Sequence, residues 1–331
     1  MSTSVIFNEI GGPEVLQLVD RPAPAPGNGE VLLEMRSIGM NRSDVAFRSG
    51  KYLAQPNLPC GLGVEGMGIV AALGAGTGHL KVGDRVSILP TFPQGGRYAT
   101  YLSEGVFPAD SLVPVPEKLD DAGAAAIWVS ILTAWGALVE LGGLGKGDYV
   151  LISAASGSVG LAAIQVARSV GAIPIATTRA SAKAQALKDA GAAHVVLSDQ
   201  QDVPTSVLQI VGDQRLRLAF DPIAGPFAEA LVPCMADEGK IFIYGGLSDQ
   251  PMYFDRRPIL SKGLSLAGYA VRQILTRPDR LERGLAFVRA GLASGALSPF
   301  VAKLFSLQDV VEAHRYMESN SHIGKIVLTV P

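Results

Sequence analysis

A glycine-rich turn is the most informative chemical feature of the sequence. It follows a short apolar run at residues 149–153 and leads into a segment whose apolar positions recur with helical spacing. The pattern corresponds to G-x-G-x-x-G with Ala155 in the first position and Gly157 and Gly160 in the other two. A glycine at the second position lets the backbone approach a pyrophosphate, and one at the third lets the helix pack close to the strand. The turn therefore predicts a dinucleotide site.

The start of the helix after this turn supplies the groups that would hold the phosphates. Backbone N–H groups near Ser158 and Val159 face outward at the helix end whose dipole favours negative charge. An ordinary tight connection between a strand and a helix would look similar. The dinucleotide interpretation is favoured because the turn follows a predicted strand, opens an amphipathic helix and begins a strand–helix–strand series.

The residues after the next predicted strand, at 173–177, bear on the identity of the dinucleotide. An NAD site usually has Asp or Glu there, about 20 residues past the motif, to bind the ribose hydroxyls. This sequence has Arg179 instead, 19 residues after Gly160, with Thr178 and Lys183 close by and no acidic residue near them. A guanidinium binds a 2′-phosphate through charge-assisted hydrogen bonds, whereas a carboxylate would repel it. The sequence thus favours NADPH over NADH; the alternative is a solvated basic loop.

Two later strands, predicted at residues 216–221 and 240–244, are followed by further candidate cofactor-binding positions. Ile223 comes after the first of them, and Gly245 and Gly246 come after the second. Ligands of open α/β sheets bind at the carboxyl ends of the strands, so these positions would lie on the ligand side of the sheet. Simple turn formation is the alternative explanation for them.

The chain as a whole divides into a β-rich outer part and an α/β middle. Short apolar runs separated by glycine turns fill the first third and predict a small barrel or sandwich. From about residue 149 strands and helices alternate, which predicts a parallel sheet with helices on both faces. The last predicted strand, 325–330, needs a sheet to join, and the N-terminal sheet is its expected host. We therefore assign residues 1–121 and 270–331 to the outer domain and residues 122–269 to the α/β domain.

Length, charge and cysteine content limit the class of protein. A chain of 331 residues is too long for one ordinary core, in agreement with two domains. The net charge of −2 makes neither nucleic acid nor an anionic membrane surface an expected partner. We expect no apolar run long enough to span a bilayer, and residues 1–10 lack the pattern of a signal peptide. Cys60 and Cys234 form no metal or disulfide pattern, so we expect free thiols and a cytoplasmic location.

Together with several other motifs, these features resemble the medium-chain dehydrogenase/reductase superfamily, in particular its zinc-free quinone-oxidoreductase (zeta-crystallin-like) branch. The likeness extends over almost the whole chain, and the order and spacing of the motifs are more specific than any single motif. The resemblance implies an α/β fold class with a GroES-like domain from both chain ends and a central Rossmann domain. The additional motifs are GMNRSD (39–44), RSGKY (48–52), GLGVEGMG (61–68), VGDRV (82–86), AAA (124–126), TAW (133–135) and GKIVL (324–328).

The same superfamily contains zinc alcohol dehydrogenases, so the positions of their zinc ligands can be compared with this sequence. A catalytic zinc needs three protein ligands, usually from Cys, His or a carboxylate. Asn41 takes the place of the first cysteine ligand of that branch, Val64 takes the place of its histidine, and the four-cysteine structural lobe is missing. Glu65 remains, but one carboxylate with Cys60 nearby does not make a site. We expect no metal.

The chemistry that needs no zinc is hydride transfer to an acceptor that spreads its own charge. A quinone or an α,β-unsaturated carbonyl requires only hydrogen-bond donors and a proton for the product anion. The resemblance implies that Asn41 lies near the nicotinamide and the substrate carbonyl, that Tyr52 is a proton donor and that Thr133 contacts the nicotinamide. The alternatives are a turn cap for Asn41, a pocket wall for Tyr52 and packing within a helix for Thr133.

Other functions remain open beside an NADPH-dependent quinone or enone reductase. One is an enoyl-thioester reductase, and another is a non-enzymatic NADPH-binding protein. The resemblance implies a homodimer joined through the edges of the Rossmann sheets, with residues 265–269 as the edge strand. The chain departs from many family members at Ser198, where they have a tyrosine near the adenosine phosphate.

Overall fold

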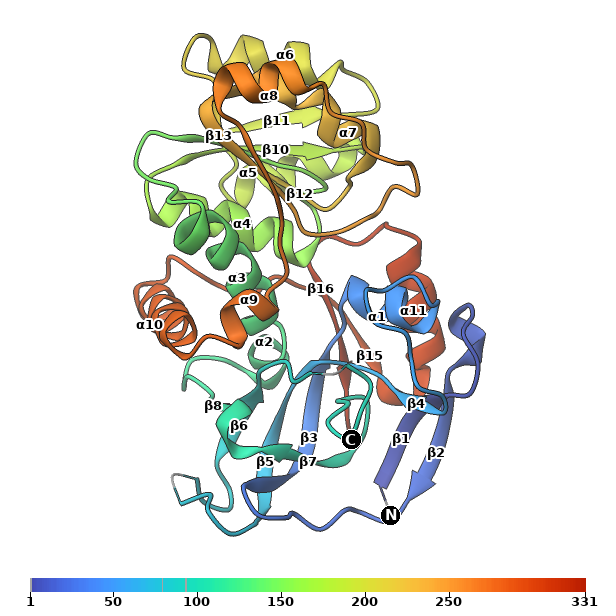
Figure 1. The fold of residues 1–331 in the computed structure, drawn as a ribbon. Coiled ribbons are helices and arrows are strands. Elements are labelled where there is room, and N and C mark those ends of the chain that lie inside the picture. The colour runs from blue at the N-terminus through green and yellow to red at the C-terminus, as the bar shows by residue number, and fades with distance from the viewer. Residues whose placement is uncertain (1, 79, 93) are drawn as a thin grey trace. The chain divides into compact units, whose positions relative to one another are not determined.

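The computed structural model describes residues 2–78, 80–92 and 94–331 of the chain. The chain forms two compact units (Figure 1). The first unit comprises Met1–Val129 and Pro299–Pro331, and the second comprises Ser130–Ser298. Each unit has its own sheets and its own hydrophobic core.

The first unit is built mainly of antiparallel β-structure. One sheet has the strand order β2–β1–β4, and a larger one has the order β15–β16–β3–β5–β6–β8 with β7 paired to β3. The C-terminal strand β16 pairs antiparallel with β3, which confirms that the N-terminal sheet receives the last strand. The strands are β1 (Ser2–Phe7), β2 (Gln17–Arg21), β3 (Glu30–Gly39), β4 (Cys60–Gly61), β5 (Glu65–Leu73), β6 (Arg85–Ile88), β7 (Glu104–Pro108), β8 (Leu112–Pro114), β15 (Val301–Ser306) and β16 (Lys325–Thr329).

The alternation of side chains along β3 explains how these strands enclose a core. Val31, Leu33 and Met35 are buried, while the residues between them are partly or fully exposed, as expected for a strand with one face on the core. Three helices cover this unit, and α1 and α11 contact each other. They are α1 (Arg42–Arg48), α2 (Asp121–Ala124) and α11 (Val310–Glu318).

The second unit contains a parallel sheet in the order β11–β10–β9–β12–β13–β14. Its central strands are buried on both faces, as parallel strands covered by helices usually are. The strand order reverses at β9, which lies between β10 and β12, and such a switch point is where open α/β sheets bind ligands. The strands are β9 (Tyr149–Ile152), β10 (Ile173–Thr178), β11 (His194–Leu197), β12 (Leu216–Asp221), β13 (Met235–Ile243) and β14 (Ser265–Gly268).

The helices of the second unit include those that connect the parallel strands. α4 follows β9, α5 follows β10 and α6 follows β11, so the predicted alternation of strands and helices is confirmed. The helices are α3 (Trp128–Trp135), which begins at the end of the first unit, α4 (Ser158–Ser169), α5 (Ala184–Asp189), α6 (Val203–Val211), α7 (Gly225–Ala230), α8 (Arg256–Lys262), α9 (Arg272–Leu275) and α10 (Pro278–Ser294).

The observed boundaries of the units differ from those predicted at residues 121/122 and 269/270. The chain returns to the first unit only at residue 299, after α10. A Cβ atom at Gly284 of α10 would come within 3.0 Å of Leu132 and Trp135, and Arg283 forms an ion pair with Glu140. These contacts attach α10 to the second unit, and the periodicity of the helix alone does not reveal them.

The expectation that no segment is long and apolar enough to span a membrane was wrong. Within the described part of the chain, the stretch Asp121–Leu141 meets that criterion by length and composition. In its most apolar window, however, 89% of the residues are buried inside the protein. A core helix passes the same test, so this stretch is weak evidence for a membrane span.

Candidate functional site

The glycine turn joins β9 to α4 and brings the backbone of Ala155 against the first turn of the helix. A Cβ atom on Gly160 would lie 2.5 Å from both the Cα and the carbonyl oxygen of Ala155, so only glycine fits there without a shift of the helix. The N–H of Ala155 donates to the carbonyl of Thr177 on β10 at 3.0 Å. The turn is thus bonded to β10, and the absence of a side chain at Gly160 lets α4 pack close to it.

The N-terminus of α4 is open to a ligand on the side of this turn. Gly157 is its N-cap and has no side chain that could accept from the first N–H groups, which include those of Ser158 and Val159. A Cβ atom on Gly157 would meet only the carbonyl oxygen of Ala154, at 3.8 Å. Open space therefore coincides with N–H groups that receive no N-cap side chain, at the helix end where the dipole favours an anion.

Basic side chains flank the turn at the end of β10. Thr178 is the last residue of this strand and is buried, whereas Arg179 directly after it is exposed. The ammonium of Lys183 donates to the hydroxyl of Ser156, in the glycine turn, at 3.4 Å. Burial, and then the charge of Arg179, lower the pKa of Lys183. The structure therefore brings Lys183 into contact with the glycine turn.

The loop after β12 is held by a buried carboxylate that sequence reasoning missed. Asp221 accepts a short hydrogen bond from the Ser153 hydroxyl and further bonds from the backbone N–H groups of Ile223, at 3.1 Å, and Ala224, at 2.7 Å. Burial raises the pKa of Asp221. These bonds tie the loop that carries Ile223 to the end of β9, next to the glycine turn.

The loop after β13 packs on the same edge. A Cβ atom on Gly245 would lie 2.8 Å from the carbonyl oxygen of Pro222, and the same oxygen accepts from the N–H of Leu247 at 3.0 Å. Gly246 has open space where its Cβ would be. Thr133 is a buried residue within α3.

In the first unit, Asn41 belongs to a buried cluster with Glu65 and Lys325. The Asn41 Oδ1 atom accepts from the Lys325 ammonium at 2.8 Å, and its Nδ2 donates to Glu65 Oε1 at 2.9 Å and to the Gly39 carbonyl at 3.3 Å. Lys325 also forms a short ion pair with Glu65, whose second oxygen accepts from the N–H of Val129 at 3.2 Å. Asn41 is 7% exposed, and the two charged residues are 1% and 2% exposed.

A second buried carboxylate adjoins this cluster. Asp44 accepts from the backbone N–H of Asn41 at 2.8 Å, from the Tyr101 hydroxyl at 3.2 Å and from Gln94 Nε2 at 3.1 Å. Burial raises the pKa of Asp44 to about 7, although the hydrogen bonds from Asn41 and Tyr101 and the charge of Lys325 oppose the rise. Asp44 thereby fixes the start of α1 and with it the backbone of Asn41.

Tyr52 lies outside this hydrogen-bonded cluster, on the chain that follows α1. Its ring packs edge to face against Phe47, with the ring centroids 6.3 Å apart, and it adjoins the hydrophobic core of the unit. Burial, and then the nearby Asp44 carboxylate, raise the pKa of the phenol, so it keeps its proton throughout the neutral range. This placement suits the wall of a pocket and is also compatible with a proton donor.

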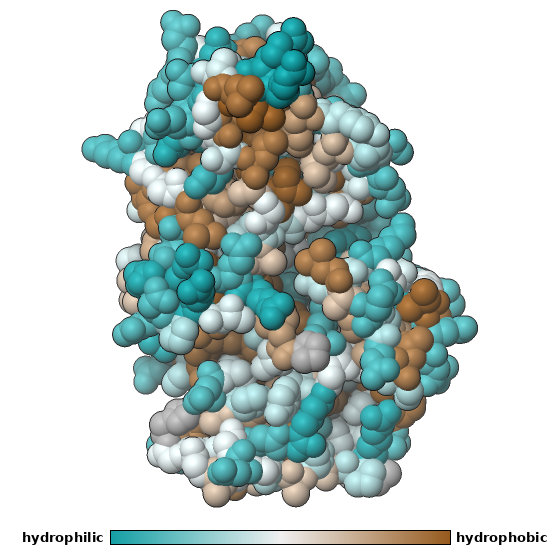
Figure 2. Space-filling view, viewed as in Figure 1, coloured by the Kyte–Doolittle hydropathy of each residue, from teal (hydrophilic) through white to brown (hydrophobic). Residues whose placement is uncertain are grey.

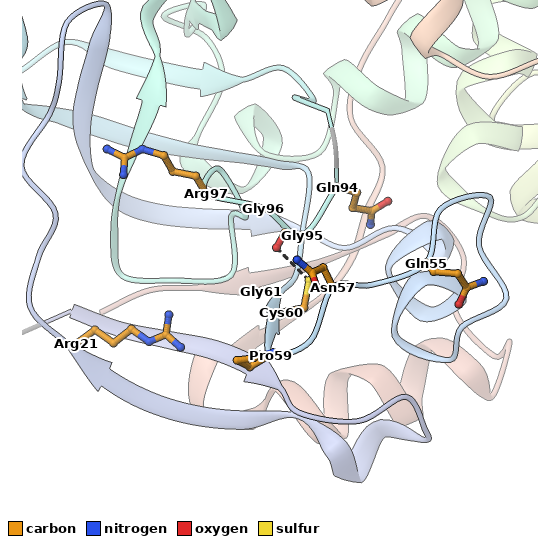
Figure 3. Close-up of a pocket in the computed structure, with 10 residues that line it drawn as sticks. All are labelled: Arg21, Gln55, Asn57, Pro59, Cys60, Gly61, Gln94, Gly95, Gly96 and Arg97. Atoms are coloured by element: carbon orange, nitrogen blue, oxygen red, sulfur yellow. Dashed lines mark hydrogen bonds between the residues drawn. The ribbon is translucent and has the colours of Figure 1, made fainter.

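A hollow of about 460 Å³ opens on the first unit (Figure 3). Gln94 lies on the side of the hollow away from Arg21, and it is the residue that donates to Asp44. On the floor, the thiol of Cys60 donates to the carbonyl of Gly95 at 3.0 Å, and burial raises the pKa of this thiol. Cys60 is therefore a protonated, hydrogen-bonded residue and not an activated nucleophile.

The described residues contain no group of three or more His, Cys, Asp or Glu side chains placed to hold a metal ion. At Asn41 and Glu65 the neighbouring charged side chain is the ammonium of Lys325. The Lys325 ammonium, which has three donors and no acceptor, contacts both Oδ1 of Asn41 and Oε1 of Glu65.

Comparisons with known proteins agree with this layout. Residues 27–117 match the alcohol dehydrogenase GroES-like domain, and residues 158–289 match the family described as zinc-binding dehydrogenase. A quinone oxidoreductase of Salmonella typhimurium is 32% identical over 99% of both chains. The chain belongs to the medium-chain dehydrogenase/reductase superfamily, in its quinone-oxidoreductase branch.

Two solved structures of similar proteins carry a dinucleotide. The Escherichia coli quinone oxidoreductase complexed with NADPH superimposes with a TM-score of 0.91, at 30% identity over 99% of both chains. A mycobacterial protein complexed with NADPH has a TM-score of 0.90, at 28% identity over 99% of this chain and 100% of that one. The predicted fold, a GroES-like domain with a Rossmann domain, is thereby confirmed for this member of the superfamily.

Within this superfamily layout, the predicted residues fall into two groups in the two units. The second unit holds Thr133 in α3 and the other cofactor candidates at the ends of β9, β10, β12 and β13, while the first unit holds Asn41 and Tyr52. Sequence reasoning missed Asp221, Lys325 and the role of Asp44, because each acts through residues far away in the chain. For Asp221 and Lys325, the only signal in the sequence was a charged residue at the end of an apolar strand: Asp221 ends β12, and Lys325 begins β16.

Proposed function

We propose that the chain is an NADPH-dependent oxidoreductase that transfers a hydride to a quinone. The sequence predicted a nicotinamide-dependent reductase of the quinone-oxidoreductase type, and the full-length relatives named quinone oxidoreductase agree with it. The finer assignment, a quinone in preference to an enone, rests on these relatives alone. Enoyl-thioester reduction and non-catalytic NADPH binding are outcomes that the experiment below distinguishes.

The observation that carries the cofactor assignment is the group of basic side chains beside the glycine turn. The exposed Arg179 follows β10, at the point in the sequence where an NAD site usually has an acidic residue, and the ammonium of Lys183 donates to Ser156 of the glycine turn. A 2′-phosphate brings two negative charges that these cations would pair with. The preference for NADPH thus follows from charge, and two similar structures hold NADPH.

The residues at the carboxyl edge of the second unit fit a bound dinucleotide. The first N–H groups of α4 would hold the pyrophosphate, and the absence of a side chain at Gly157 leaves room for it. Gly246 would leave similar room at the loop after β13, while Asp221 keeps the loop with Ile223 in place. When bound, NADPH supplies the hydride.

Asn41 is the proposed hydrogen-bond donor for the acceptor oxygen. It is the member of the buried cluster with some exposed surface, and its longest bond, to the carbonyl of Gly39, is the one that a ligand would most easily replace. Tyr52 keeps its proton at neutral pH and is the proposed donor of a proton where the product is an enolate. A reduced quinone can take its protons from solvent.

We further propose a cytoplasmic homodimer joined through β14. This strand lies at one edge of the parallel sheet, as predicted, and Leu266 on it is 37% exposed. Figure 2 shows apolar surface over α8, where Leu260 is 75% exposed. A free strand edge beside exposed apolar side chains favours pairing with a second copy. The molar mass in solution, measured by light scattering, tests the dimer.

The test of the function is the initial rate of NADPH and NADH oxidation by the chelator-treated protein. The acceptors are a benzoquinone, a polycyclic ortho-quinone, a small enone and a crotonyl thioester. We expect the highest kcat/KM with NADPH and a quinone, unchanged by the chelator. A preference for the crotonyl thioester would identify an enoyl-thioester reductase instead. NADPH binding without turnover of any acceptor would make the chain a binding protein, and a loss of activity on chelation would contradict the absence of a metal.

A further inference from the structure

Three neighbouring strands of the first unit deliver the buried cluster. β16 pairs with β3 and β3 pairs with β5 (Figure 1). Lys325 is the first residue of β16, Glu65 is the first residue of β5, and Asn41 follows the end of β3 as the N-cap of α1. The antiparallel register places the start of β16, the start of β5 and the end of β3 at the same end of the sheet. Residues that are far apart in the chain therefore meet there.

The backbone is adapted to this arrangement at Gly39. A Cβ atom there would lie 2.1 Å from the carbonyl oxygen of Ala125 and 2.8 Å from Glu65 Oε1. Any side chain would therefore displace the carboxylate from its position beside the ammonium. Gly39 thus makes room for the ion pair of Glu65 and Lys325. Stability alone does not require this pair, because replacing a buried ion pair by well-packed apolar residues often costs no stability.

The two charges hold the Asn41 amide at both ends. Lys325 can only donate, and it binds Oδ1; the Glu65 carboxylate accepts, and it binds Nδ2. If the amide were rotated by 180°, its NH2 group would face the ammonium and its oxygen would face the carboxylate. Both contacts would then be repulsive, so one orientation of the amide is fixed.

The same contacts leave one N–H of the amide directed at a weak partner. Of the three hydrogen bonds of the Asn41 amide, the bond to the Gly39 carbonyl is the longest, at 3.3 Å. An ammonium bound to the amide oxygen draws electron density from the nitrogen and makes its N–H groups better donors, as in other hydrogen-bond chains. A donor fixed in advance stabilises a developing oxyanion without reorganisation.

We infer that Lys325 is a positioning residue for Asn41, holding and polarising its amide so that one N–H can serve the oxygen of the hydride acceptor as negative charge develops there. The inference rests on the proposed function, in which Asn41 lies beside the acceptor. Glu65 completes the arrangement by holding the opposite end of the amide. The lysine itself, 1% exposed, does not touch the acceptor.

The decisive variant is the double substitution Lys325→Met with Glu65→Gln. Lys325→Met alone leaves a carboxylate buried without its cation and is expected to destabilise the fold, whereas the double variant removes both charges together. If the lysine served only to neutralise Glu65, the double variant would recover the wild-type kcat. We expect it instead to keep the wild-type Kd for NADPH and the wild-type KM, and to lose at least 10-fold in kcat with a benzoquinone.

A cycle with Asn41→Ala separates positioning from general damage. In the wild-type background we expect Asn41→Ala to lower kcat at least 10-fold; in the double variant we expect it to lower kcat less than 3-fold further, because the amide there is no longer held. A double variant within 2-fold of the wild-type kcat would overturn the inference. So would an equal loss from Asn41→Ala in both backgrounds.

The orientation of the amide can also be followed without turnover. In ¹⁵N-edited spectra the Asn41 NH2 pair, identified by its loss in Asn41→Asp, should give two separate resonances that exchange slowly with solvent. We expect faster exchange in the double variant, and an unchanged pair would overturn the inference. If wild-type protein reduced no acceptor, the proposed function would fail, while this measurement would still decide whether Lys325 holds Asn41.

Discussion

In the second unit the basic side chains proposed to bind a cofactor lie at the surface, whereas the charges around Asn41 in the first unit are buried. Arg179 is exposed beside the glycine turn, while Lys325 and Glu65 neutralise each other inside the protein. A surface cation can pair with the charge that a ligand brings. A buried cation must have its partner within the chain, because burial of an unpaired charge costs several kcal/mol.

The difference teaches how each unit can contribute to a reaction. The second unit offers open space at the N-terminus of a helix that has a glycine as its N-cap, as a site for a charged ligand requires. The first unit offers a side chain fixed by a closed network, as the positioning of a reacting group requires. Substitutions in the second unit should therefore change binding, and those in the first unit should change kcat or stability.

The largest effect is expected from Gly160→Val. The added side chain meets the backbone of Ala155 at 2.5 Å, so α4 must move away from β9, at a cost of about 3 kcal/mol in the free energy of unfolding. Thermal unfolding and NADPH titration would both register the change. Gly157→Ala is the matched control: its Cβ has space, so only the poorer N-cap should lower stability, by about 1 kcal/mol or less, while NADPH affinity falls. Equal stability of the two variants would contradict the close-packing argument.

The next largest effect is expected from Arg179→Ala. Loss of charge-assisted hydrogen bonds to a 2′-phosphate should raise the Kd for NADPH by roughly 10- to 100-fold and leave the Kd for NADH unchanged. Fluorescence titration with both dinucleotides measures this. Lys188→Ala, which removes another exposed cation on α5, should change neither value. A parallel loss for NADH would show that Arg179 does not recognise the phosphate.

Two buried titratable groups of the first unit, His314 and Asp44, should make the free energy of unfolding depend on pH. His314 accepts from Arg48 at 3.0 Å, and burial with the charge of Arg48 lowers the pKa of the imidazole to about 3. The unfolded chain then binds more protons below about pH 6.5, so His314 makes stability fall as the pH drops. Asp44, with its pKa raised to about 7, has the opposite effect: the folded state binds more protons between about pH 4 and 7, so stability falls as the pH rises.

His314→Asn separates these opposing effects. The asparagine keeps an acceptor for Arg48 and cannot titrate, so only the Asp44 slope should remain. We expect the free energy of unfolding to decrease by about 1 kcal/mol per unit as the pH rises from 5 to 7, whereas the wild-type value should change little. Urea unfolding at several pH values measures the slope. An identical pH profile for the two proteins would show that His314 does not titrate as its burial requires.

The smallest effect is expected from Tyr52→Phe with a quinone. The substitution keeps the edge-to-face contact with Phe47 and removes only the hydroxyl, so kcat should fall less than about 3-fold because solvent can protonate the product. With a small enone the loss should be larger, about 10-fold, if the phenol donates the proton. The ratio of the two rates checks this, and equal losses would assign Tyr52 to the wall of the pocket.

The local sequence determined the cofactor edge of the second unit. Gly157, Gly160 and Arg179 lie within 23 residues of one another, and a strand, a turn and a helix leave little choice in how they meet. The fold class and the alternation of strands and helices followed from the same short-range patterns, and they are confirmed. Short-range patterns succeed here because helix and strand periodicities act over a few residues.

Only the tertiary structure decided the cluster around Asn41 and the boundaries of the units. Asn41, Glu65 and Lys325 come from three strands whose pairing sets their distances, and no spacing in the sequence encodes that register. The buried Asp221 and the packing of α10 on the second unit have the same origin. Buried polar groups need hydrogen-bond partners, and here these partners come from distant parts of the sequence. The sequence therefore shows which residues are charged, and only the fold decides whether a charged residue binds a ligand or another residue.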